Sequence, residues 1–222
     1  MKVVDLSAGL TDGFLTYPGD PPVRILRTQT HSKNGYQLCS LSMGTHSGTH
    51  VDLPLHCLKD GMGADTFPLE TFIGNAVTVS RPTGEHGKIS VSDLEGVDIG
   101  RGDILLICTG WSTHVGDPQF FKDFPYIDIP AADYLISKGI KALGCDMPSV
   151  DPPTSETPVH HALLGAGIGI VEALVNLEKV VGKRAQFIGF PLHIAGGDGS
   201  PVRAVAVLES GDVQREGKEP SR

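Results

Sequence analysis

The sequence predicts an α/β domain with many short strands and few helices, and three observations support this prediction. The 222 residues include 28 glycines and 16 prolines without a repeat period, which favours short strands joined by tight turns over a helical bundle. The apolar run DILLIC at 103–108 is typical of a strand that is buried on both faces. Residues 129–138 show the clearest helical pattern, with Pro130 at a start position and apolar residues on one face.

The other elements are predicted in chain order from apolar runs and the turns between them. A short strand opens the chain within 1–10, and the Pro-Gly-Asp chemistry of TYPGDPP predicts a rigid turn at 16–22. Further strands are expected at 23–30, 35–43, 75–80, 141–145 and 185–193, and after the tight turn at 196–200. Short helices are expected at 65–72 and 90–95. We place a single domain at residues 1–210 and a polar, loose tail at 211–222.

The composition limits the partners and the compartment of the protein. A net charge of −8 disfavours nucleic acid and anionic membranes as partners. The longest apolar stretch, 162–177, is too short and too polar to span a bilayer. The cysteines contain no C-x-x-C pair, which suits a reducing cytoplasm: they are Cys39, Cys57, Cys108 and Cys145. We therefore expect a cytoplasmic protein that acts on a small molecule and forms a homo-oligomer, a dimer or tetramer.

The segment GTHSGTHVDLPLH at 44–56 carries most of the candidate chemistry. Its polar members His46, His50, Asp52 and His56 lie at even offsets from one another. An extended backbone would therefore point all four to one face, because side chains alternate along a strand. A helix is disfavoured by the proline and the glycines in the segment. We predict a strand or extended loop that presents four polar side chains together, with Val51, Leu53 and Leu55 facing a core.

These four side chains predict a metal site. Neutral imidazole and carboxylate are the usual protein ligands of zinc, manganese and iron, and an aspartate can bridge two ions. The simpler alternative is a solvated strand face with ordinary polar residues. Four such groups within eleven residues, in a chain with nine histidines, favour the metal. The pattern does not name the ion.

A second segment adds two candidates, His160 and Glu172. On one unbroken helix, residues twelve positions apart would lie about 120° apart. The glycines at 165, 167 and 169 disfavour such a helix, and a short helix from His160 followed by a strand at 168–173 would bring the pair together. The G-x-G-x-G spacing here differs from that of a dinucleotide site. Two other residues stay open: Tyr17 is a pocket wall or a surface aromatic, and Asp146 supports a metal ligand or caps a turn.

The motif HSGTHVDLPLH resembles the defining motif of the cyclase family of metal-dependent hydrolases, which includes arylformamidases (kynurenine formamidases) and isatin hydrolases. Three further segments, TYPGDPP, HHALLGAGIGIVE and GGDGSPVRAV, are similar to the other signatures of that family and occur in the same order. The resemblance covers residues 5–208. It implies a swivelling β/β/α domain with a mixed central sheet.

The resemblance also implies a site with one or two divalent ions, Zn or Mn. By position, His46, His50 and Asp52 look like ligands of the first ion, and Asp52 would bridge to a second ion held by His160 and Glu172. His160 is preferred to its neighbour because the family's gap to the glutamate is twelve residues.

Two more roles follow from the resemblance. His56 looks like the catalytic acid/base, and Tyr17 falls where the formamidases carry a tryptophan in the substrate pocket. This departure leaves the substrate open between an aryl formamide, such as N-formylkynurenine, and a cyclic amide or lactone of the isatin type. A non-catalytic metal-binding protein is the third alternative, and intact His56 counts against it.

The ligand types predict the reaction class. A divalent ion lowers the pKa of bound water from 15.7 to about 7, so hydroxide is available at neutral pH. We expect attack of metal-bound hydroxide on an amide, formamide or lactone carbonyl, with His56 accepting the proton and delivering it to the leaving group. A thiol nucleophile at Cys57 is disfavoured, because alternation turns it away from His56.

Overall fold

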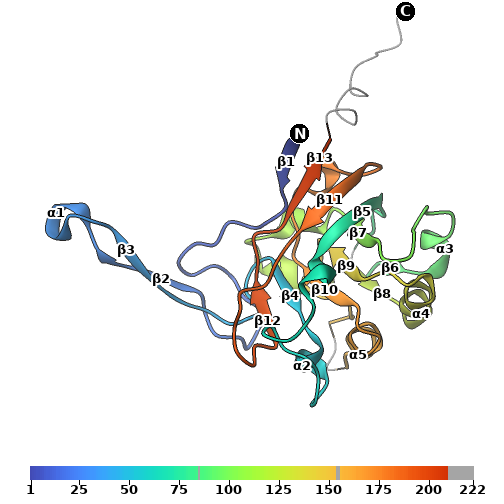
Figure 1. Ribbon diagram of the computed structural model, residues 1–222, viewed down its shortest axis with the longest axis horizontal. Coiled ribbons are helices and arrows are strands. Elements are labelled where there is room, and N and C mark those ends of the chain that lie inside the picture. Colours follow the sequence, from blue (N-terminus) through green and yellow to red (C-terminus); the bar gives the residue numbers. More distant parts are fainter. Residues whose placement is uncertain (85, 154–155, 210–222) are drawn as a thin grey trace, which may run out of the picture.

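A mixed sheet of nine strands forms the centre of the computed structural model, which describes residues 1–84, 86–153 and 156–209 (Figure 1). In spatial order, its strands are β1 (Lys2–Asp5), β13 (Val205–Leu208), β11 (Arg184–Ile188), β5 (Ile73–Ser80), β7 (Ile104–Cys108), β9 (Ala142–Cys145), β10 (Gly169–Glu172), β4 (His50–Asp52) and β12 (Gly199–Pro201). The four strands from β5 to β10 are parallel, and antiparallel strands flank them on both sides. The predicted α/β class with a mixed sheet is confirmed. The tail predicted at 211–222 lies outside the described residues.

Few helices accompany this sheet. They are α1 (His31–Asn34), α2 (Pro54–Cys57), α3 (Val91–Leu94), α4 (Ile129–Lys138) and α5 (Pro158–Gly165), with 3₁₀ turns at Leu69–Phe72, Trp111–His114, Pro118–Phe121 and Leu177–Lys179. A small parallel pair joins β6 (Lys88–Ile89) to β8 (Tyr126–Ile127). No helix in the described ranges is long and apolar enough to cross a membrane.

Hydrophobic clusters fill both faces of the sheet. Leu105 and Ile107 of β7 join the cluster beneath α4 and α5, whereas Ile104 and Leu106 join the cluster on the opposite face. All four side chains are fully buried. The strand predicted at 103–108 is therefore buried on both faces, as a central strand with covered faces must be.

Helix α4 has the bounds that the sequence predicts. The Asp128 side chain accepts a hydrogen bond from the Ala131 amide at 2.9 Å, and Pro130 lies in the first turn. Gly139 ends the helix in the left-handed conformation, with φ of 69°. The helix predicted at 90–95 forms only one turn, α3, with a capping box between Ser90 and Asp93.

Two predicted elements are wrong in extent. The helix predicted at 65–72 is only a 3₁₀ turn at Leu69–Phe72. Pro68 disfavours helical geometry at the residue before it, so no longer helix forms. The strand predicted at 185–193 ends at Ile188, since Ile188 pairs with Ile73 and β5 begins there. No partner strand extends the ladder further among the described residues.

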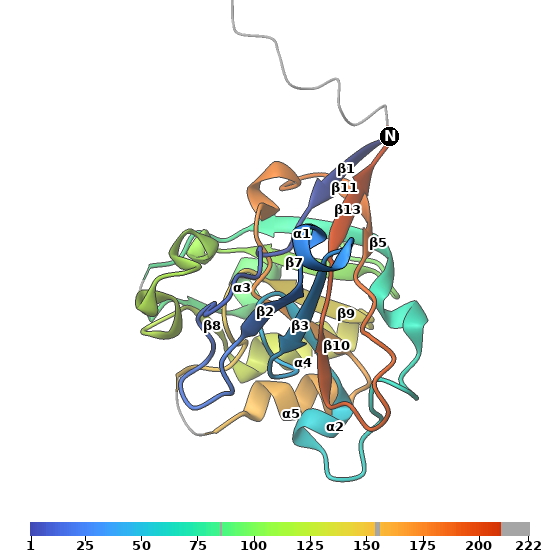
Figure 2. The same cartoon turned by 90° about the vertical axis from the view of Figure 1, so that its left-hand side faces the viewer.

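A two-stranded arm stands apart from the sheet. Strands β2 (Arg24–Gln29) and β3 (Leu38–Ser42) pair only with each other, and α1 joins them at the tip. Figure 1 shows this arm projecting away from the body, and Figure 2 views it along its length. The strands predicted at 23–30 and 35–43 thus form a hairpin that lies outside the core.

Candidate metal centre

Strand β4 provides the centre of the site from inside the sheet. It lies between β10 and β12, and its register places His50 opposite Glu172. Directly opposed residues of an antiparallel pair share a face, and the His50 Nε2 atom lies 3.6 Å from Glu172 Oε2. The same nitrogen lies 3.3 Å from Asp52 Oδ1. All three side chains are buried.

Helix α5 adds His160 from the other segment. The chain leaves α5 through Gly167, whose φ of 76° suits a left-handed turn, and enters β10. This path brings His160 Nε2 to 3.3 Å from Glu172 Oε1 and 3.4 Å from Asp52 Oδ2. The helix-then-strand arrangement expected from the glycines is the one that the structure shows.

His46 reaches the cluster from the turn before β4. Its Nδ1 atom lies 2.7 Å from Asp52 Oδ1, and its Nε2 atom lies 2.9 Å from Asp198 Oδ2. The imidazole packs against Gly199, where a Cβ atom would come within 2.6 Å of the His46 ring. Any larger residue at this position would displace the histidine.

His56 lies beside the cluster, but the backbone that carries it is not extended. Pro54 begins the one-turn helix α2, so the prediction of a continuous extended run to His56 is wrong. The helix still turns His56 toward the cluster, with ring centroids 4.1 Å from His46 and 5.8 Å from His160. Its Nδ1 atom lies 3.4 Å from Asp198 Oδ2.

The sequence reasoning missed two carboxylates that hold the histidines. Asp151 Oδ2 is 2.6 Å from His160 Nδ1, and both oxygens of Asp151 accept hydrogen bonds from backbone amides at the start of α5. Asp198 Oδ2 accepts from His46, and Asp198 Oδ1 accepts from the Thr45 hydroxyl at 2.9 Å. Asp198 lies in the glycine-rich turn before β12, and that turn was the sequence feature that could have identified it as a site residue.

Several contacts orient the imidazoles toward a common centre. The His50 Nδ1 atom bonds the Gly48 carbonyl at 2.8 Å, and the His160 Nδ1 atom bonds Asp151. Each ring therefore directs Nε2 toward Asp52 and Glu172. Metal-binding histidines usually have the second nitrogen held in this way.

The acidic and basic groups of the cluster stabilise one another's charged forms, and this shifts their pKa values. Burial would lower the pKa of His46, but hydrogen bonds and charge interactions with Asp52 and Asp198 outweigh burial and raise that pKa to about 9. Burial is likewise outweighed at His160, whose pKa is raised by the neighbouring carboxylates, with Asp151 first. Burial also opposes ionisation of Asp52, yet the imidazoles, His50 first, hold its pKa well below the usual range. A cation that enters the cluster must displace protons from the histidines.

The donor set fits a divalent ion. Asp52 Oδ2 is buried and accepts no hydrogen bond in the described part of the chain. Such an oxygen is costly unless something pairs with it. Two groups of donor atoms, each within 4.8 Å of one another, share Asp52: one contains His46 and His56, the other His50 and Glu172. His56 is thus close enough to be a ligand, an alternative to its predicted acid/base role.

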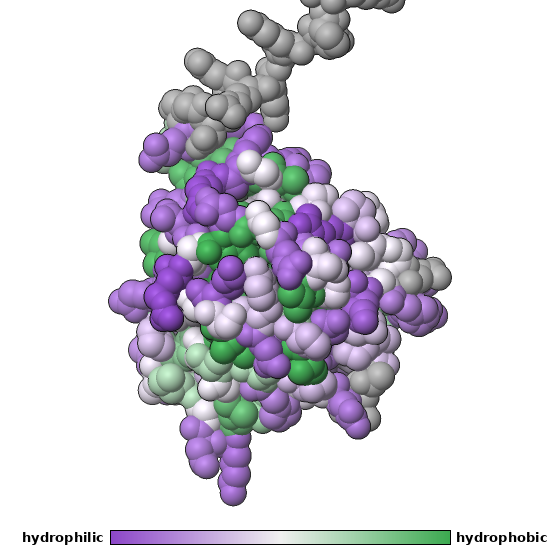
Figure 3. Space-filling model, turned by 90° about the vertical axis from the view of Figure 1, so that its right-hand side faces the viewer, coloured by the Kyte–Doolittle hydropathy of each residue, from purple (hydrophilic) through white to green (hydrophobic). Residues whose placement is uncertain are grey.

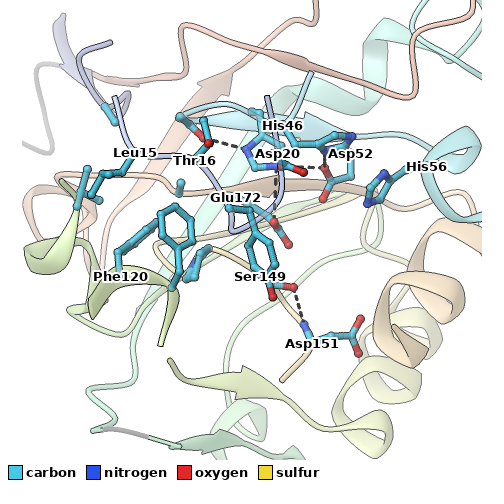
Figure 4. A pocket seen from close by; sticks show the side chains of 18 of the residues that line it. Leu15, Thr16, Asp20, His46, Asp52, His56, Phe120, Ser149, Asp151 and Glu172 are labelled. Atoms are coloured by element: carbon cyan, nitrogen blue, oxygen red, sulfur yellow. Dashed lines mark hydrogen bonds and ion pairs between the residues drawn. The ribbon is translucent and has the colours of Figure 1, made fainter. Parts of the chain in front are cut away.

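A cavity of about 280 Å³ opens onto this cluster. Figure 4 shows His46, Asp52, Glu172 and His56 at one end, and Leu15 and Phe120 at the other. Tyr17 lines the apolar end, and its ring centroid lies 5.7 Å from that of Phe121 in an edge-on contact. Of the two alternatives for Tyr17, the structure therefore favours the pocket wall.

Asp146 does not join the metal cluster. Its carboxylate accepts hydrogen bonds from the Thr109 amide and hydroxyl and from the Gly110 amide, so it fixes the turn after β7. His114 lies in a 3₁₀ turn with its ring centroid 4.5 Å from that of Trp111. Of the two alternatives for Asp146, the structure favours the turn.

A largely buried cluster of three imidazoles and two carboxylates beside a cavity is the arrangement expected of a metal-dependent enzyme, here built on an α/β fold. Comparison with known proteins specifies the family: a family model described as "Putative cyclase" matches residues 4–152. The kynurenine formamidase of Geobacillus thermodenitrificans is 36% identical over 206 residues, which cover 90% of this chain and 95% of that protein. The chain belongs to the cyclase family, as its motifs indicate.

Solved structures agree with this assignment. Isatin hydrolase A from Ralstonia solanacearum superposes with a TM-score of 0.86 at 27% identity, covering 94% of this chain and 92% of that one. A Bacillus stearothermophilus protein described as a "predicted metal-dependent hydrolase" has a TM-score of 0.76 at 30% identity, covering 92% and 97%. The fold of this chain is therefore that of the isatin hydrolases of the family.

Proposed function

We propose that this protein is a metal-dependent hydrolase of C–N bonds other than peptide bonds, and that its substrate is an aryl formamide such as N-formylkynurenine. The observation that carries the proposal is the position of the buried histidine–carboxylate cluster at the end of an apolar-walled cavity. The formamidase relative, 36% identical along 90% of this chain, supports the substrate class.

The two ends of the cavity differ in polarity, so they would bind different parts of the substrate. A formyl group is small and polar, and it would lie at the end that holds Asp52 and His56. The aryl ring would lie between Phe120, Phe121 and Tyr17, whose faces and edges suit another aromatic ring. A volume of about 280 Å³ is near the lower limit for ligand pockets, so a small substrate fits better than a peptide.

His46, His50, Asp52, His160 and Glu172 are the residues that would hold the ion or ions. A divalent ion bound there supplies Lewis acidity for the carbonyl and makes water a stronger acid. Imidazole with carboxylate suits zinc or manganese, and the two donor groups that share Asp52 support two ions.

His56 is the residue that we assign to proton transfer. With Nδ1 directed to Asp198, its Nε2 atom is left to accept a proton from the attacking water. The water oxygen then bonds the formyl carbon, the C–N bond breaks, and His56 returns the proton to the leaving nitrogen. Formate and an aryl amine are the products.

The test is hydrolysis of N-formylkynurenine by the purified protein, before and after chelation, with elemental analysis of each sample. We expect chelation to abolish turnover and zinc or manganese to restore it. Hydrolysis that survives complete removal of metal would contradict the proposal. Metal uptake without hydrolysis of any amide would instead support a non-catalytic protein.

The His56→Ala variant tests the proton-transfer role. We expect kcat to fall by about 10²–10⁴-fold while the metal content stays unchanged. The control is His161→Ala, which removes an exposed imidazole that bonds the Thr157 carbonyl one position beyond His160. Loss of metal from His56→Ala alone would make His56 a ligand.

A cyclic amide of the isatin type is the second candidate substrate. The TM-score of 0.86 to an isatin hydrolase favours it. The two candidates differ in what is released, because ring opening retains both product halves in one molecule. A panel with N-formylkynurenine and isatin, compared by kcat/KM, separates them.

We also propose a cytoplasmic setting, a small-molecule substrate, and no nucleic-acid or membrane partner. All four cysteines are free, which supports a reducing compartment. The net charge of −8 supports the exclusion of anionic polymers and surfaces.

A further inference from the structure

A tight turn holds two polar side chains of the cavity wall, Tyr17 and Asp20, close to each other. The Asp20 amide donates a hydrogen bond to the Tyr17 carbonyl at 3.0 Å, which closes a four-residue β-turn. Pro18 and Gly19 occupy the two central positions, and Gly19 has a φ of 103°, so the turn has the residues that type II geometry favours. Both Tyr17 and Asp20 line the cavity that leads to the metal cluster (Figure 4).

This turn is anchored on the segment that carries the metal ligands. Pro21 follows Asp20 directly, and its Cδ atom lies 3.5 Å from the position that a Cβ atom would take on Gly44. Gly44 is the first residue of the motif segment 44–56. A proline also restricts the backbone of the residue before it, so Pro21 fixes the conformation of Asp20. The backbone alone therefore holds Asp20 in place.

The carboxylate of Asp20 is not needed for the fold. It accepts no hydrogen bond and forms no ion pair with another residue in the described ranges, and it is exposed. The other carboxylates that line the cavity each contact a histidine; they belong to Asp52, Asp151 and Glu172. Asp20 is thus the cavity carboxylate whose charge is available to a ligand.

No lysine or arginine balances this charge among the described residues that line the cavity. Burial, and then the negative charges of Glu172 and Asp20, raise the pKa of the Tyr17 phenol, so the Asp20 carboxylate acts electrostatically on that side chain. A cationic group of a ligand beside Tyr17 would be attracted to Asp20. A carboxylate group in the same place would be repelled.

We propose that Asp20 determines substrate specificity, by selecting aryl formamides whose ring carries a positively charged amino group over those whose ring carries a carboxylate. This specificity rests on the proposed function, because the formyl group at the metal cluster sets the position of the ring. A ring between Phe120, Phe121 and Tyr17 lies beside the turn, so its outer substituent reaches Asp20. The ammonium group then donates a charge-assisted hydrogen bond to the carboxylate.

Three formanilides of similar size test the proposal. 3-(Aminomethyl)formanilide is a cation at neutral pH, 3-ethylformanilide is neutral, and 3-carboxyformanilide is an anion. The Asp20→Asn variant removes the charge and keeps a residue that turns favour. Relative to wild type, we expect its kcat/KM to fall about 3-fold to 10-fold for the cation, to stay unchanged for the neutral compound, and to rise for the anion.

Two further features separate a charge effect from a structural effect. The change should appear in KM and not in kcat, because Asp20 contacts the substituent equally in the ground state and in the transition state. Added salt should reduce it. The Asp20→Lys variant should hydrolyse the anion better than the cation, which reverses the wild-type preference.

Asp133→Asn is the matched control. Asp133 is an exposed residue of α4 and does not line the cavity. Helix α4 lies on the side of the molecule that Figure 3 shows, where hydrophilic and hydrophobic side chains are interspersed. This variant changes the net charge of the chain by the same amount as Asp20→Asn. We expect all three kcat/KM values to equal those of wild type.

Binding of the amine products distinguishes this proposal from the proposed function. 3-(Aminomethyl)aniline and 3-ethylaniline are titrated calorimetrically into wild type and Asp20→Asn, with and without zinc. We expect the Kd of the cation to rise about 3-fold to 10-fold in the variant and that of the neutral amine to stay unchanged. If no formanilide is hydrolysed but this difference in binding is found, the proposed function fails and the specificity of Asp20 stands.

Two results would overturn the role of Asp20. One is an Asp20→Asn variant that hydrolyses and binds the charged and neutral compounds as wild type does. The other is an equal loss for the cationic and the neutral compound, which would make Asp20 a residue of the fold. The circular dichroism spectrum of each variant verifies that it is folded.

Discussion

Two antiparallel strand pairs of this chain, β4–β10 and β2–β3, have the same kind of backbone ladder and opposite surroundings. Every residue of β4 and β10 is buried, with further strands on both sides. No residue of β2 or β3 is buried. In the first pair, neighbouring strands and two hydrophobic clusters determine where each side chain points. In the second, only the ladder itself does so.

The difference explains why the chemistry is in the first pair. A metal centre needs donor atoms held to within about 0.5 Å, and this requires fixed rotamers and held second nitrogens. His50 has its second nitrogen bonded to the Gly48 carbonyl, and the Glu172 carboxylate is fixed by a hydrogen bond from the Val150 amide. Side chains on an unpacked hairpin keep their rotamer freedom, so they cannot hold donor atoms in fixed positions.

The largest expected effect is that of Asp52→Asn, which removes the shared charge of the buried pair β4–β10. Three imidazoles contact this carboxylate at 2.7–3.4 Å. We expect metal content at background and kcat/KM lower by about 10³-fold or more. Without metal, the variant should lose about 3–5 kcal/mol of stability, because breaking a buried charge cluster leaves its partners unpaired.

Thermal unfolding with and without zinc is the measurement for Asp52→Asn. The wild-type Tm should rise with zinc, since an ion at 100 times its Kd stabilises the folded state by about 2.7 kcal/mol. The variant should show no such rise. A variant that retains one full equivalent of tightly bound zinc would show that the remaining donors suffice.

A smaller effect is expected from Asp151→Asn, which leaves the donor set intact and weakens only the residue that orients His160. One oxygen of Asp151 accepts from both the His160 ring and the His160 amide. We expect zinc affinity to fall by about 10–100-fold in competition with a chromophoric chelator.

Asp146→Asn is the matched control for Asp151→Asn. It alters a carboxylate that is equally buried and also bonded to backbone amides, but whose contacts are Thr109 and Gly110. Both variants should lose about 1–3 kcal/mol of stability. Equal losses of zinc affinity in the two variants would mean that Asp151 acts only through the fold.

Elements with a complete local pattern could be predicted from the sequence. The strand at 103–108 and the helix at 129–138 carry their patterns within their own residues and, for the helix, in the adjoining caps Asp128 and Gly139, and the structure confirms both. The strand predicted at 185–193 ran too far, because its end is set by the first residue of β5, more than a hundred positions away. The arm strands were predicted, but nothing in their pattern showed that they leave the body.

The same distinction applies to the site. His46, His50 and Asp52 lie within seven residues, so their spacing alone identified them as candidate metal ligands. Asp198 contacts His46 across 152 residues of sequence, and only folding reveals that contact. Asp151 lies nine residues before His160, and no motif or spacing pattern in the sequence marked it as a partner of that histidine.

The smallest expected effect is that of Leu41→Ala on the arm, compared with Leu53→Ala beside β4. Leu53 is fully buried in the motif segment, and truncation should cost about 2–5 kcal/mol of unfolding free energy. Leu41 is 62% exposed, so its truncation should change the stability of the monomer by less than about 0.5 kcal/mol.

Denaturant unfolding of both variants at several protein concentrations completes this comparison. The cost of Leu53→Ala should be independent of concentration, because its contacts lie within one chain. The cost of Leu41→Ala should stay small at every concentration, because its side chain makes little apolar contact within the folded chain. A concentration-independent cost above 1 kcal/mol for Leu41→Ala would instead place that side chain against its own chain, and the contrast between the two strand pairs would no longer hold.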